Sequence, residues 1–315
     1  MPQSADPGEI ERGALLLRAG RLVAFPTETV YGLGANALDA EAVGRIYAVK
    51  RRPGTSPIIV HVSSIEMARS LVASWPESAE RLARRFWPGP LTLVLEKQAA
   101  IPAIVTASLS TVGLRMPAHP VAIALIQAAG VPVAAPSANR FTELSPTTAE
   151  HVRRSLGDEV DLILDGGPCE VGIESTVISL AEPRPTLLRP GGISRTELED
   201  VIGPVGWAEE VQAGAHAAPG MHPRHYSPRT TLYLAVDGNV PDRGQGIYLR
   251  HEHAASRAGV LTEQMPRSAS DYAAALYEVL HRADAGNYDW IAVDLPPSTP
   301  EWEAVRDRLK RAAAK

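Results

Sequence analysis

Short apolar runs alternate with helix-like segments along the first part of the chain. The polar and apolar spacing between these runs predicts helices that begin after Asp39, at Pro120 and after Ser194, where Glu197 completes a capping box. Such an alternation is typical of an α/β domain, in which helices cover a sheet. We interpret as strands the runs at 22–25, 58–62, 91–95, 112–115, 131–135, 162–164, 175–180 and 186–188.

A second, smaller α/β unit is predicted towards the C-terminus. From about residue 203 to 229 the composition changes to Gly, Ala, Pro and His, which indicates a linker. Beyond it, strand-like runs are separated by helical patterns. A length of 315 residues also favours two domains. We therefore expect domains at 1–203 and 230–315, joined by a linker at 204–229.

Composition narrows the class of protein. The chain is 45% hydrophobic and 21% charged, as in ordinary globular proteins. Its net charge of −5 argues against a general nucleic-acid coat but permits a local basic pocket. The single cysteine, Cys169, excludes an intramolecular disulfide and fits a reducing cytoplasm. No run is long enough for a membrane helix and the first residues do not resemble a signal peptide, so we expect a cytoplasmic protein without membrane association.

Two polar segments carry the first sign of chemistry. The sequence KRR at 50–52 closes a helix before a proline, and SAN at 137–139 follows an apolar strand and a proline. Each has a simple structural alternative, a solvated helix end for the first and a hydrogen-bonded turn for the second. If the two segments meet, their cations, hydroxyl and amide predict a pocket for a polyanion.

Further polar residues lie at predicted strand ends. The segment PTETVYGLG at 26–34 places hydroxyls after a strand, where open α/β sheets bind ligands, although an ordinary turn explains it equally well. It matches neither a dinucleotide fingerprint nor a phosphate loop. His61 lies in an apolar strand, where a structural histidine is as expected as a ligand contact. Arg115, also in a strand, needs a carboxylate partner from the protein or from a substrate.

Taken together, these motifs resemble the YrdC/Sua5 family. PTETVYGLG, KRRP, the strand with His61, SAN followed by SPT, ESTVI and LRPGG occur in this order. The segment PGMHPRHYSP at 219–228 resembles the one that distinguishes two-domain Sua5 proteins from shorter YrdC proteins. The resemblance covers about 10–229 by motif and the rest by position and length. It implies a catalytic domain with a twisted, open mixed sheet and helices, and a smaller Rossmann-like C-terminal Sua5 domain.

The resemblance also implies an activity. Family members are nucleotidyltransferases that make L-threonylcarbamoyladenylate and pyrophosphate from L-threonine, bicarbonate or CO₂, and ATP. The product feeds the t6A modification at position 37 of tRNAs that read ANN codons, through a threonylcarbamoyl transferase complex. Mg²⁺ is expected on the ATP phosphates, with no protein ligand assigned and no organic cofactor. Stable tRNA binding is not expected.

The site residues are carried over motif by motif. The resemblance implies a catalytic KxR…SxN set of Lys50, Arg52, Ser137 and Asn139. It implies an ATP site formed by Arg52, Ser56, Thr111, Ser137, Ser145, Arg189 and Tyr226. It implies a threonine site, in which Arg115 pairs with the substrate carboxylate, formed by Thr29, His61, Arg115, Ala135 and Ser175. No general base is identified.

Two alternatives remain at this point. The linker is either a tether or a lid, in which Tyr226 reaches back onto ATP and keeps water from a hydrolysable product. The basic pocket belongs either to this enzyme or to an RNA-binding module, which the net charge disfavours. A carbamoyl-transfer maturation domain is set aside, because such proteins need additional zinc-binding cysteines.

Overall fold

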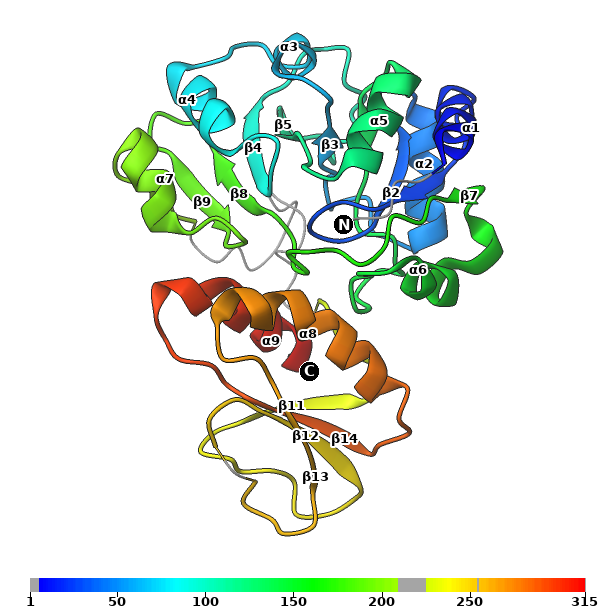
Figure 1. Cartoon of the computed structure of the whole chain (residues 1–315). Coiled ribbons are helices and arrows are strands. Elements are labelled where there is room, and N and C mark those ends of the chain that lie inside the picture. The colour runs from blue at the N-terminus through cyan, green and yellow to red at the C-terminus, as the bar shows by residue number, and fades with distance from the viewer. Residues whose placement is uncertain (1–5, 209–224, 254, 315) are drawn as a thin grey trace.

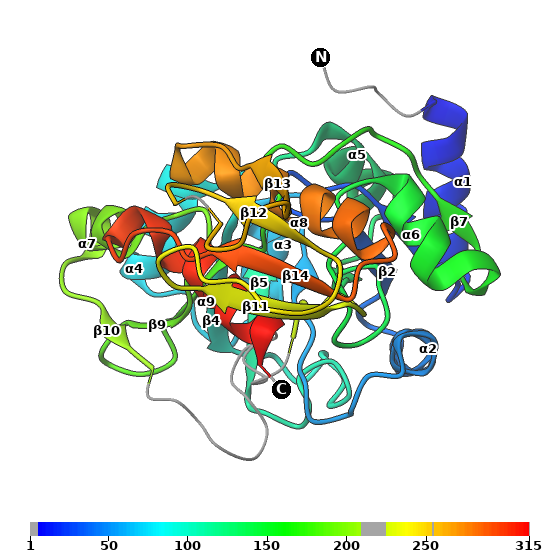
Figure 2. The ribbon, with the colours of Figure 1, turned by 90° about the horizontal axis from the view of Figure 1, so that it is seen from below.

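The computed structural model describes residues 6–208, 225–253 and 255–314. Two α/β parts are stacked on each other, and the smaller C-terminal part lies below the larger one in Figure 1. Seen from below, its sheet and helices lie across the middle of the larger part (Figure 2). Residues 209–224 of the predicted linker lie outside the described residues. No helix in the described ranges is long and apolar enough to cross a membrane.

A ten-stranded mixed sheet forms the centre of the larger part, in the order β10-β9-β8-β4-β5-β3-β6-β2-β1-β7. Neighbours run parallel in some pairs, such as β4 with β8, and antiparallel in others, such as β4 with β5. This confirms the predicted mixed sheet. The strands are β1 (Val23–Phe25), β2 (Gly32–Asn36), β3 (Val60–His61), β4 (Leu91–Glu96), β5 (Thr111–Arg115), β6 (Val133–Ala134), β7 (Leu162–Ile163), β8 (Thr176–Ser179), β9 (Thr186–Arg189) and β10 (Gly206–Trp207).

The capping residues predicted from sequence begin the helices as expected. The Asp39 side chain accepts from two backbone N–H groups at the start of one helix, and Ser194 and Glu197 form a complete capping box at another. The helices are α1 (Pro7–Arg18), α2 (Ala40–Lys50), α3 (Ile65–Ser70), α4 (Glu77–Phe86), α5 (Pro120–Ala129), α6 (Ala149–Leu156) and α7 (Arg195–Ile202), with a 3-10 turn η1 (Gly157–Glu159).

Some strands differ from the sequence prediction. The runs at 58–62 and 131–135 form strands only over Val60–His61 and Val133–Ala134. Pro57 precedes the first run and Pro132 lies within the second, and a proline cannot donate to a ladder. Strand β2 was not predicted, because its glycines give no apolar alternation. Glycine is required there, since a Cβ on Gly34 would lie 2.8 Å from the Phe25 ring. Two residues of the predicted linker form β10, which pairs with β9.

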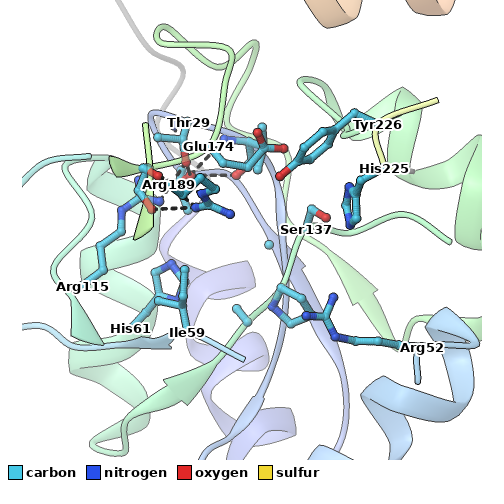
Figure 3. A pocket seen from close by; sticks show the side chains of 16 residues that line it. Thr29, Arg52, Ile59, His61, Arg115, Ser137, Glu174, Arg189, His225 and Tyr226 are labelled. Carbon is cyan, nitrogen blue, oxygen red and sulfur yellow. Dashed lines mark hydrogen bonds between the residues drawn. The ribbon is translucent and has the colours of Figure 1, made fainter. Parts of the chain in front are cut away.

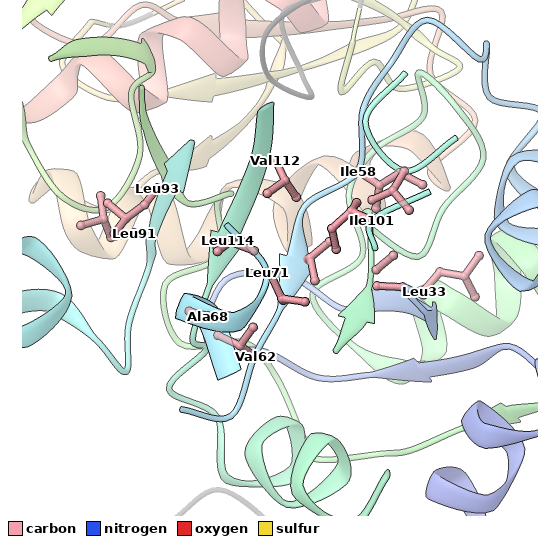
Figure 4. Close-up of a cluster of buried hydrophobic side chains, with 14 of the residues drawn as sticks. Leu33, Ile58, Val62, Ala68, Leu71, Leu91, Leu93, Ile101, Val112 and Leu114 are labelled. Atoms are coloured by element: carbon pink, nitrogen blue, oxygen red, sulfur yellow. The ribbon is translucent and has the colours of Figure 1, made fainter. Parts of the chain in front are cut away.

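Two apolar clusters cover the main sheet. One lies under α2, α3, α4, α6 and α7, and Figure 4 shows how Leu33, Leu71 and Leu114 contribute to it from strands and from the end of α3. The other joins α1 and α5 to β1 and β6. Complete burial of one such leucine is worth about 1.5–3 kcal/mol. These clusters hold the strand ends, and therefore the loops that follow them, in fixed positions.

The smaller part is a parallel four-stranded sheet in the order β11-β14-β12-β13, which agrees with the Rossmann-like prediction. Its long helices lie between this sheet and the larger part (Figure 1). Strand β13 was not predicted, because its residues are mostly exposed and lack an apolar run. The elements are β11 (Thr231–Ala235), β12 (Gly246–Arg250), β13 (Leu261–Gln264), α8 (Ala269–Asp284), β14 (Trp290–Asp294), η2 (Pro300–Trp302) and α9 (Glu303–Ala313).

The two parts share one apolar cluster. Val30, Leu144 and Ile173 of the larger part pack in the same cluster as side chains of α8 and α9. Gly172 makes the closest backbone approach described for a glycine of this interface. A Cβ at this position would lie 2.5 Å from the Cα atom of Ala274 in α8. The interface therefore requires glycine at position 172.

Gly172→Ala tests this interface. Gly172 has a φ of 73°, so alanine is strained there by about 1–2 kcal/mol, and the clash with α8 adds about 1–3 kcal/mol. We expect the free energy of unfolding, measured by chemical denaturation, to fall by the sum of the two. The control is Gly130→Ala, because Gly130 has a φ of 66° but nothing within 4 Å of a built Cβ. Equal losses in the two variants would contradict the close approach to α8.

Candidate active site

A cavity lies where the loop after β1, the turn after β6 and the ends of β8 and β9 meet (Figure 3). His225 and Tyr226 cover the cavity from the side of the smaller part. Its volume of about 50 Å³ leaves room for a few water molecules. It is lined by Thr27, Thr29, Val30, Gly32, Arg52, Ile59, His61, Arg115, Ala135, Pro136, Ser137, Glu174, Ser175, Arg189, His225 and Tyr226.

The two polar segments singled out in the sequence meet directly. The Lys50 ammonium group donates to the carbonyl oxygen of Ser137 at 2.5 Å and to that of Asn139. Burial lowers the pKa of Lys50 well below its ordinary value, and the nearby Arg52 lowers it further. The Asn139 amide donates to the carbonyls of Arg140 and Glu143, at 2.9 Å each. Lys50 and Asn139 therefore brace the turn that presents Ser137, and neither is among the lining residues of the cavity.

Arg52 reaches the cavity from the end of α2. Its guanidinium donates to the hydroxyl of Ser56 at 2.6 Å and to the carbonyl of Pro57 at 2.9 Å, and it lies 5.8 Å from the centre of the Phe141 ring. Burial lowers the pKa of Arg52 to about 10, so it remains a cation at pH 7. Ser56 thus positions Arg52 and does not line the cavity itself.

Two other residues predicted for ATP lie behind the wall of the cavity. Thr111 begins β5 and lines a separate small gap of about 10 Å³. The hydroxyl of Ser145, fully buried, donates to Glu174 at 2.5 Å. Their predicted contact with ATP remains a prediction.

Arg115 has a protein carboxylate as its partner. Its NH2 atom faces the Glu28 carboxylate at 2.7 Å, and its NH1 atom donates to the Thr29 hydroxyl at 2.9 Å. Both charged side chains are almost fully buried. The second oxygen of Glu28 accepts from the backbone N–H of Ala118. A substrate carboxylate at Arg115 would therefore share the guanidinium with Glu28.

His61 lies beside Arg115 on the floor of the cavity (Figure 3). Burial and the charge of Arg115 lower its pKa to about 3, so its ring is neutral at pH 7. Its Nδ1 atom has no hydrogen-bond partner within the described part of the chain. The ring packs edge-on against Phe25, with a centroid distance of 6.1 Å. His61 therefore offers one unsatisfied polar atom next to the cavity.

Ser175 and Arg189 are held together at the ends of β8 and β9. Arg189 donates to the carbonyl of Ser175 at 2.9 Å and to its hydroxyl at 3.2 Å. The same hydroxyl is 2.8 Å from that of Thr92. Burial lowers the pKa of Arg189. Ala135, at the end of β6, presents only a methyl group to the cavity.

Tyr226 and His225 close the cavity on the side of the smaller part. Tyr226 is 1% exposed and has a φ of 61°, a left-handed conformation that is costly for a residue with a bulky side chain. Its hydroxyl has no hydrogen-bond partner among the residues that the structure describes. His225 packs edge-on against Phe141. Strain at a cavity-covering residue indicates a conformation held by its surroundings rather than by local preference.

Sequence reasoning missed several wall residues. Thr27 accepts from the backbone N–H groups of the loop that carries Thr29, and Glu28 pairs with Arg115. Glu174 stands in the ESTVI motif but was given no role. All three residues lie within the PTETVYGLG or ESTVI motif, so their place in a motif is the signal that could have identified them. Within the described ranges, no group of three or more His, Cys, Asp or Glu side chains is arranged to hold a metal ion.

Comparisons with known proteins cover the whole chain. The family model described as "Telomere recombination" matches residues 15–191, and the model described as "Threonylcarbamoyl-AMP synthase, C-terminal domain" matches residues 193–314. A threonylcarbamoyl-AMP synthase of Bacillus subtilis (strain 168) is 43% identical over 98% of this chain and 94% of its own length. A threonylcarbamoyl-AMP synthase of Pyrococcus abyssi is 40% identical over 97% of this chain and 94% of its own length.

A solved structure agrees with these matches. The crystal structure of P. abyssi Sua5 complexed with L-threonine superposes with a TM-score of 0.90, at 38% identity, over 99% of this chain and 96% of the other. The similarity extends over both α/β parts. The chain therefore belongs to the YrdC/Sua5 family, as a protein of the two-domain Sua5 type.

Proposed function

We propose that this chain is an L-threonylcarbamoyladenylate synthase that makes threonylcarbamoyl-AMP and pyrophosphate from L-threonine, bicarbonate or CO₂, and ATP. One observation carries the proposal: Arg52, Ser137 and Arg189 converge on the same cavity as Arg115 and His61. The first group suits phosphates, and the second suits an amino acid. In chemical class the enzyme is a nucleotidyltransferase.

The proposed reaction needs three small reactants in one place. The threonine amine forms a bond with the carbon of CO₂ and loses a proton to solvent, which gives a carbamate; with bicarbonate, a water molecule leaves as this bond forms. An oxygen of the carbamate then attacks the α-phosphorus of ATP. The bond from the α-phosphorus to the oxygen of the β-phosphate breaks, and pyrophosphate leaves. Positioning of this kind supplies effective molarities of about 10⁵ M or more.

Arg52 and Arg189 supply the positive charge that this transfer requires. Negative charge grows on the phosphate oxygens as pyrophosphate leaves, and preformed cations stabilise it without reorganisation. Both guanidiniums lie in the cavity wall and are held by hydrogen bonds to carbonyl oxygens. Lys50 does not line the cavity, and it acts indirectly by fixing the turn that presents Ser137. Mg²⁺ arrives with ATP as part of the substrate and is assigned no protein ligand.

At the other end of the cavity, Arg115 would bind the threonine carboxylate. Neutral His61 has an unsatisfied nitrogen beside it, and Thr29 and Ser175 add hydroxyl groups. Glu28 keeps the guanidinium in place while the cavity holds no substrate. A bidentate pair with a substrate carboxylate would then be weaker than at an unpaired arginine, which favours release.

Tyr226 favours the lid interpretation of the linker. Tyr226 and His225 line the same cavity as Arg52, Ser137 and Arg189 and are almost fully buried there, so we infer that they move when ATP and threonine enter. Their return would exclude water from a product that hydrolyses readily. We further propose that the product passes to a cytoplasmic threonylcarbamoyl transferase complex acting on tRNA.

The substrate requirement provides the first test. Pyrophosphate release from MgATP should require both L-threonine and bicarbonate, and mass spectrometry should detect threonylcarbamoyl-AMP. ATP consumption at the same rate without threonine would contradict the proposal. Salt-dependent RNA binding that ignores ATP and threonine would instead favour an RNA-binding module.

Arg52→Gln tests the phosphate end of the cavity. We expect kcat/KM for ATP to fall by about 10²–10³-fold, because one preformed charge at the leaving phosphates is lost. The matched control is Arg51→Gln, since Arg51 is adjacent but exposed. Circular dichroism checks that both variants fold. Equal activity of the two variants would remove Arg52 from the site.

Tyr226→Phe and Tyr226→Ala separate the ring from the hydroxyl. Because the hydroxyl has no hydrogen-bond partner in the described ranges, Tyr226→Phe should still close the cavity and keep the ratio of threonylcarbamoyl-AMP to pyrophosphate. Tyr226→Ala should lower that ratio, since water then reaches the product. An unchanged ratio in Tyr226→Ala would support a tether rather than a lid.

A further inference from the structure

One charged side chain of the smaller part is buried against the active site. Arg308 lies on α9, on the same face as Ala304, Val305 and Leu309, which are all buried. Its side chain has an exposed fraction of 0%. Stability alone would favour an apolar residue on this face, because burying a charge costs more than the pairing usually returns. The charge therefore indicates a second role.

Arg308 contacts three segments outside its own helix. Its Nε atom donates to the Glu174 carboxylate at 2.7 Å, and its NH2 atom donates to the carbonyl of Pro190 at 3.0 Å. The guanidinium also lies 5.3 Å from the centre of the Tyr226 ring. Asp307, its neighbour on α9, accepts from NH1 at 2.7 Å. One side chain thus joins three separate segments around the cavity.

Helix α8 strengthens the same junction. The Tyr277 hydroxyl donates to the Glu174 carboxylate, at 3.1 Å and 3.2 Å from its two oxygens. The Ser145 hydroxyl donates at 2.5 Å to Oε1, the oxygen that lies 3.2 Å from the Tyr277 hydroxyl. Glu174 therefore receives hydrogen bonds from α8, from α9 and from the larger part. Both oxygens of its carboxylate are engaged by these donors.

The three segments held by Arg308 carry residues of the proposed active site. Ser175 directly follows Glu174, and Arg189 directly precedes Pro190. Tyr226 covers the cavity. A shift of Arg308 would therefore move Ser175 at the proposed threonine site, Arg189 at the proposed phosphate site and the covering residue Tyr226 at the same time. A displacement of about 1 Å in such a site costs about 10²-fold in rate.

We propose that Arg308 is a positioning residue of the active site, through which the C-terminal domain sets the relative position of Ser175, Arg189 and Tyr226. The proposal rests on the proposed function. It gives the smaller domain a part in the reaction: Arg308 acts through Glu174 and the Pro190 carbonyl and does not touch the reacting atoms.

Kinetics of purified full-length variants test the proposal. Arg308→Gln should lower kcat/KM for both ATP and threonine by about tenfold or more, because the hydrogen bonds to a charged partner are lost. Arg308→Lys keeps the positive charge but lacks the planar fork that reaches both Glu174 and Pro190. Its loss in kcat/KM should therefore be smaller than that of Arg308→Gln, but not absent. The control is Arg306→Gln, since Arg306 on the same helix donates to the carbonyl of Pro296 in its own domain.

A pH profile separates positioning from simple stability. Burial alone would raise the pKa of Glu174, but Arg308, Arg189 and the Ser145 hydroxyl outweigh it and hold the pKa below its usual value. Without Arg308 the pKa of Glu174 rises, so this carboxylate becomes protonated at a higher pH than in the wild type. The activity of Arg308→Gln should therefore fall as pH decreases through a range in which wild-type activity is constant, and it should recover at higher pH. The charged and titratable groups that face Glu174 are Arg189 of β9, Tyr277 of α8, Asp307 and Arg308 of α9, and Tyr226.

The double variant Arg308→Gln with Glu174→Gln completes the test. It has no carboxylate to titrate at position 174, so the new acid limb should disappear, and its loss in kcat/KM should be less than the product of the two single losses. If Arg308→Gln does not fold, Glu174→Gln alone should lower kcat/KM for both substrates. Folded variants with wild-type kcat/KM, no acid limb and only a lowered melting temperature would overturn the proposal. Absence of product from the wild type would instead overturn the proposed function.

Discussion

Burial of positive charge is the constraint on which this structure depends. A cation removed from water must find partners, and here many of those partners are backbone carbonyls. Lys50 takes the carbonyls of Ser137 and Asn139, Arg52 takes that of Pro57, and Arg189 takes that of Ser175. Carbonyl oxygens stabilise a cation without neutralising it. The same contacts that join distant segments of the larger part therefore leave a positive potential in the cavity, which suits phosphates and a carboxylate.

Two other buried arginines pair with carboxylates instead of relying on backbone carbonyls. Arg115 faces Glu28, and Arg308 faces Glu174. In both pairs the carboxylate fixes the direction of the guanidinium group. The shared apolar cluster then supports this arrangement, because Val30, Ile173 and Tyr226 pack with α8 and α9. The active site and the interface between the two parts are consequently one packed region.

Much of this could be predicted from sequence, for identifiable reasons. Largely apolar runs such as 91–95 and capping residues such as Asp39 are local signals, and both predictions were confirmed by β4 and by the start of α2. Strand β2 was missed because its stability comes from close approach to Phe25 rather than from alternation. Motifs identified the segments of the site, but not the direction of each side chain. Lys50 and Asn139 turn towards the backbone, whereas Arg52 and Ser137 reach the cavity.

The partner of Glu174 has a consequence for how the protein is assembled. Arg308 follows Glu174 by 134 positions, so the contact has a very high sequence separation and forms late in a chain that folds as it is synthesised. Until α9 is made, Glu174 lacks the arginine that pairs with its carboxylate. The larger part can form its sheet early, yet the segments around Glu174 and Pro190 gain their contacts with Arg308 only when α9 docks. Order of synthesis thus delays a competent site until the whole two-domain unit is complete.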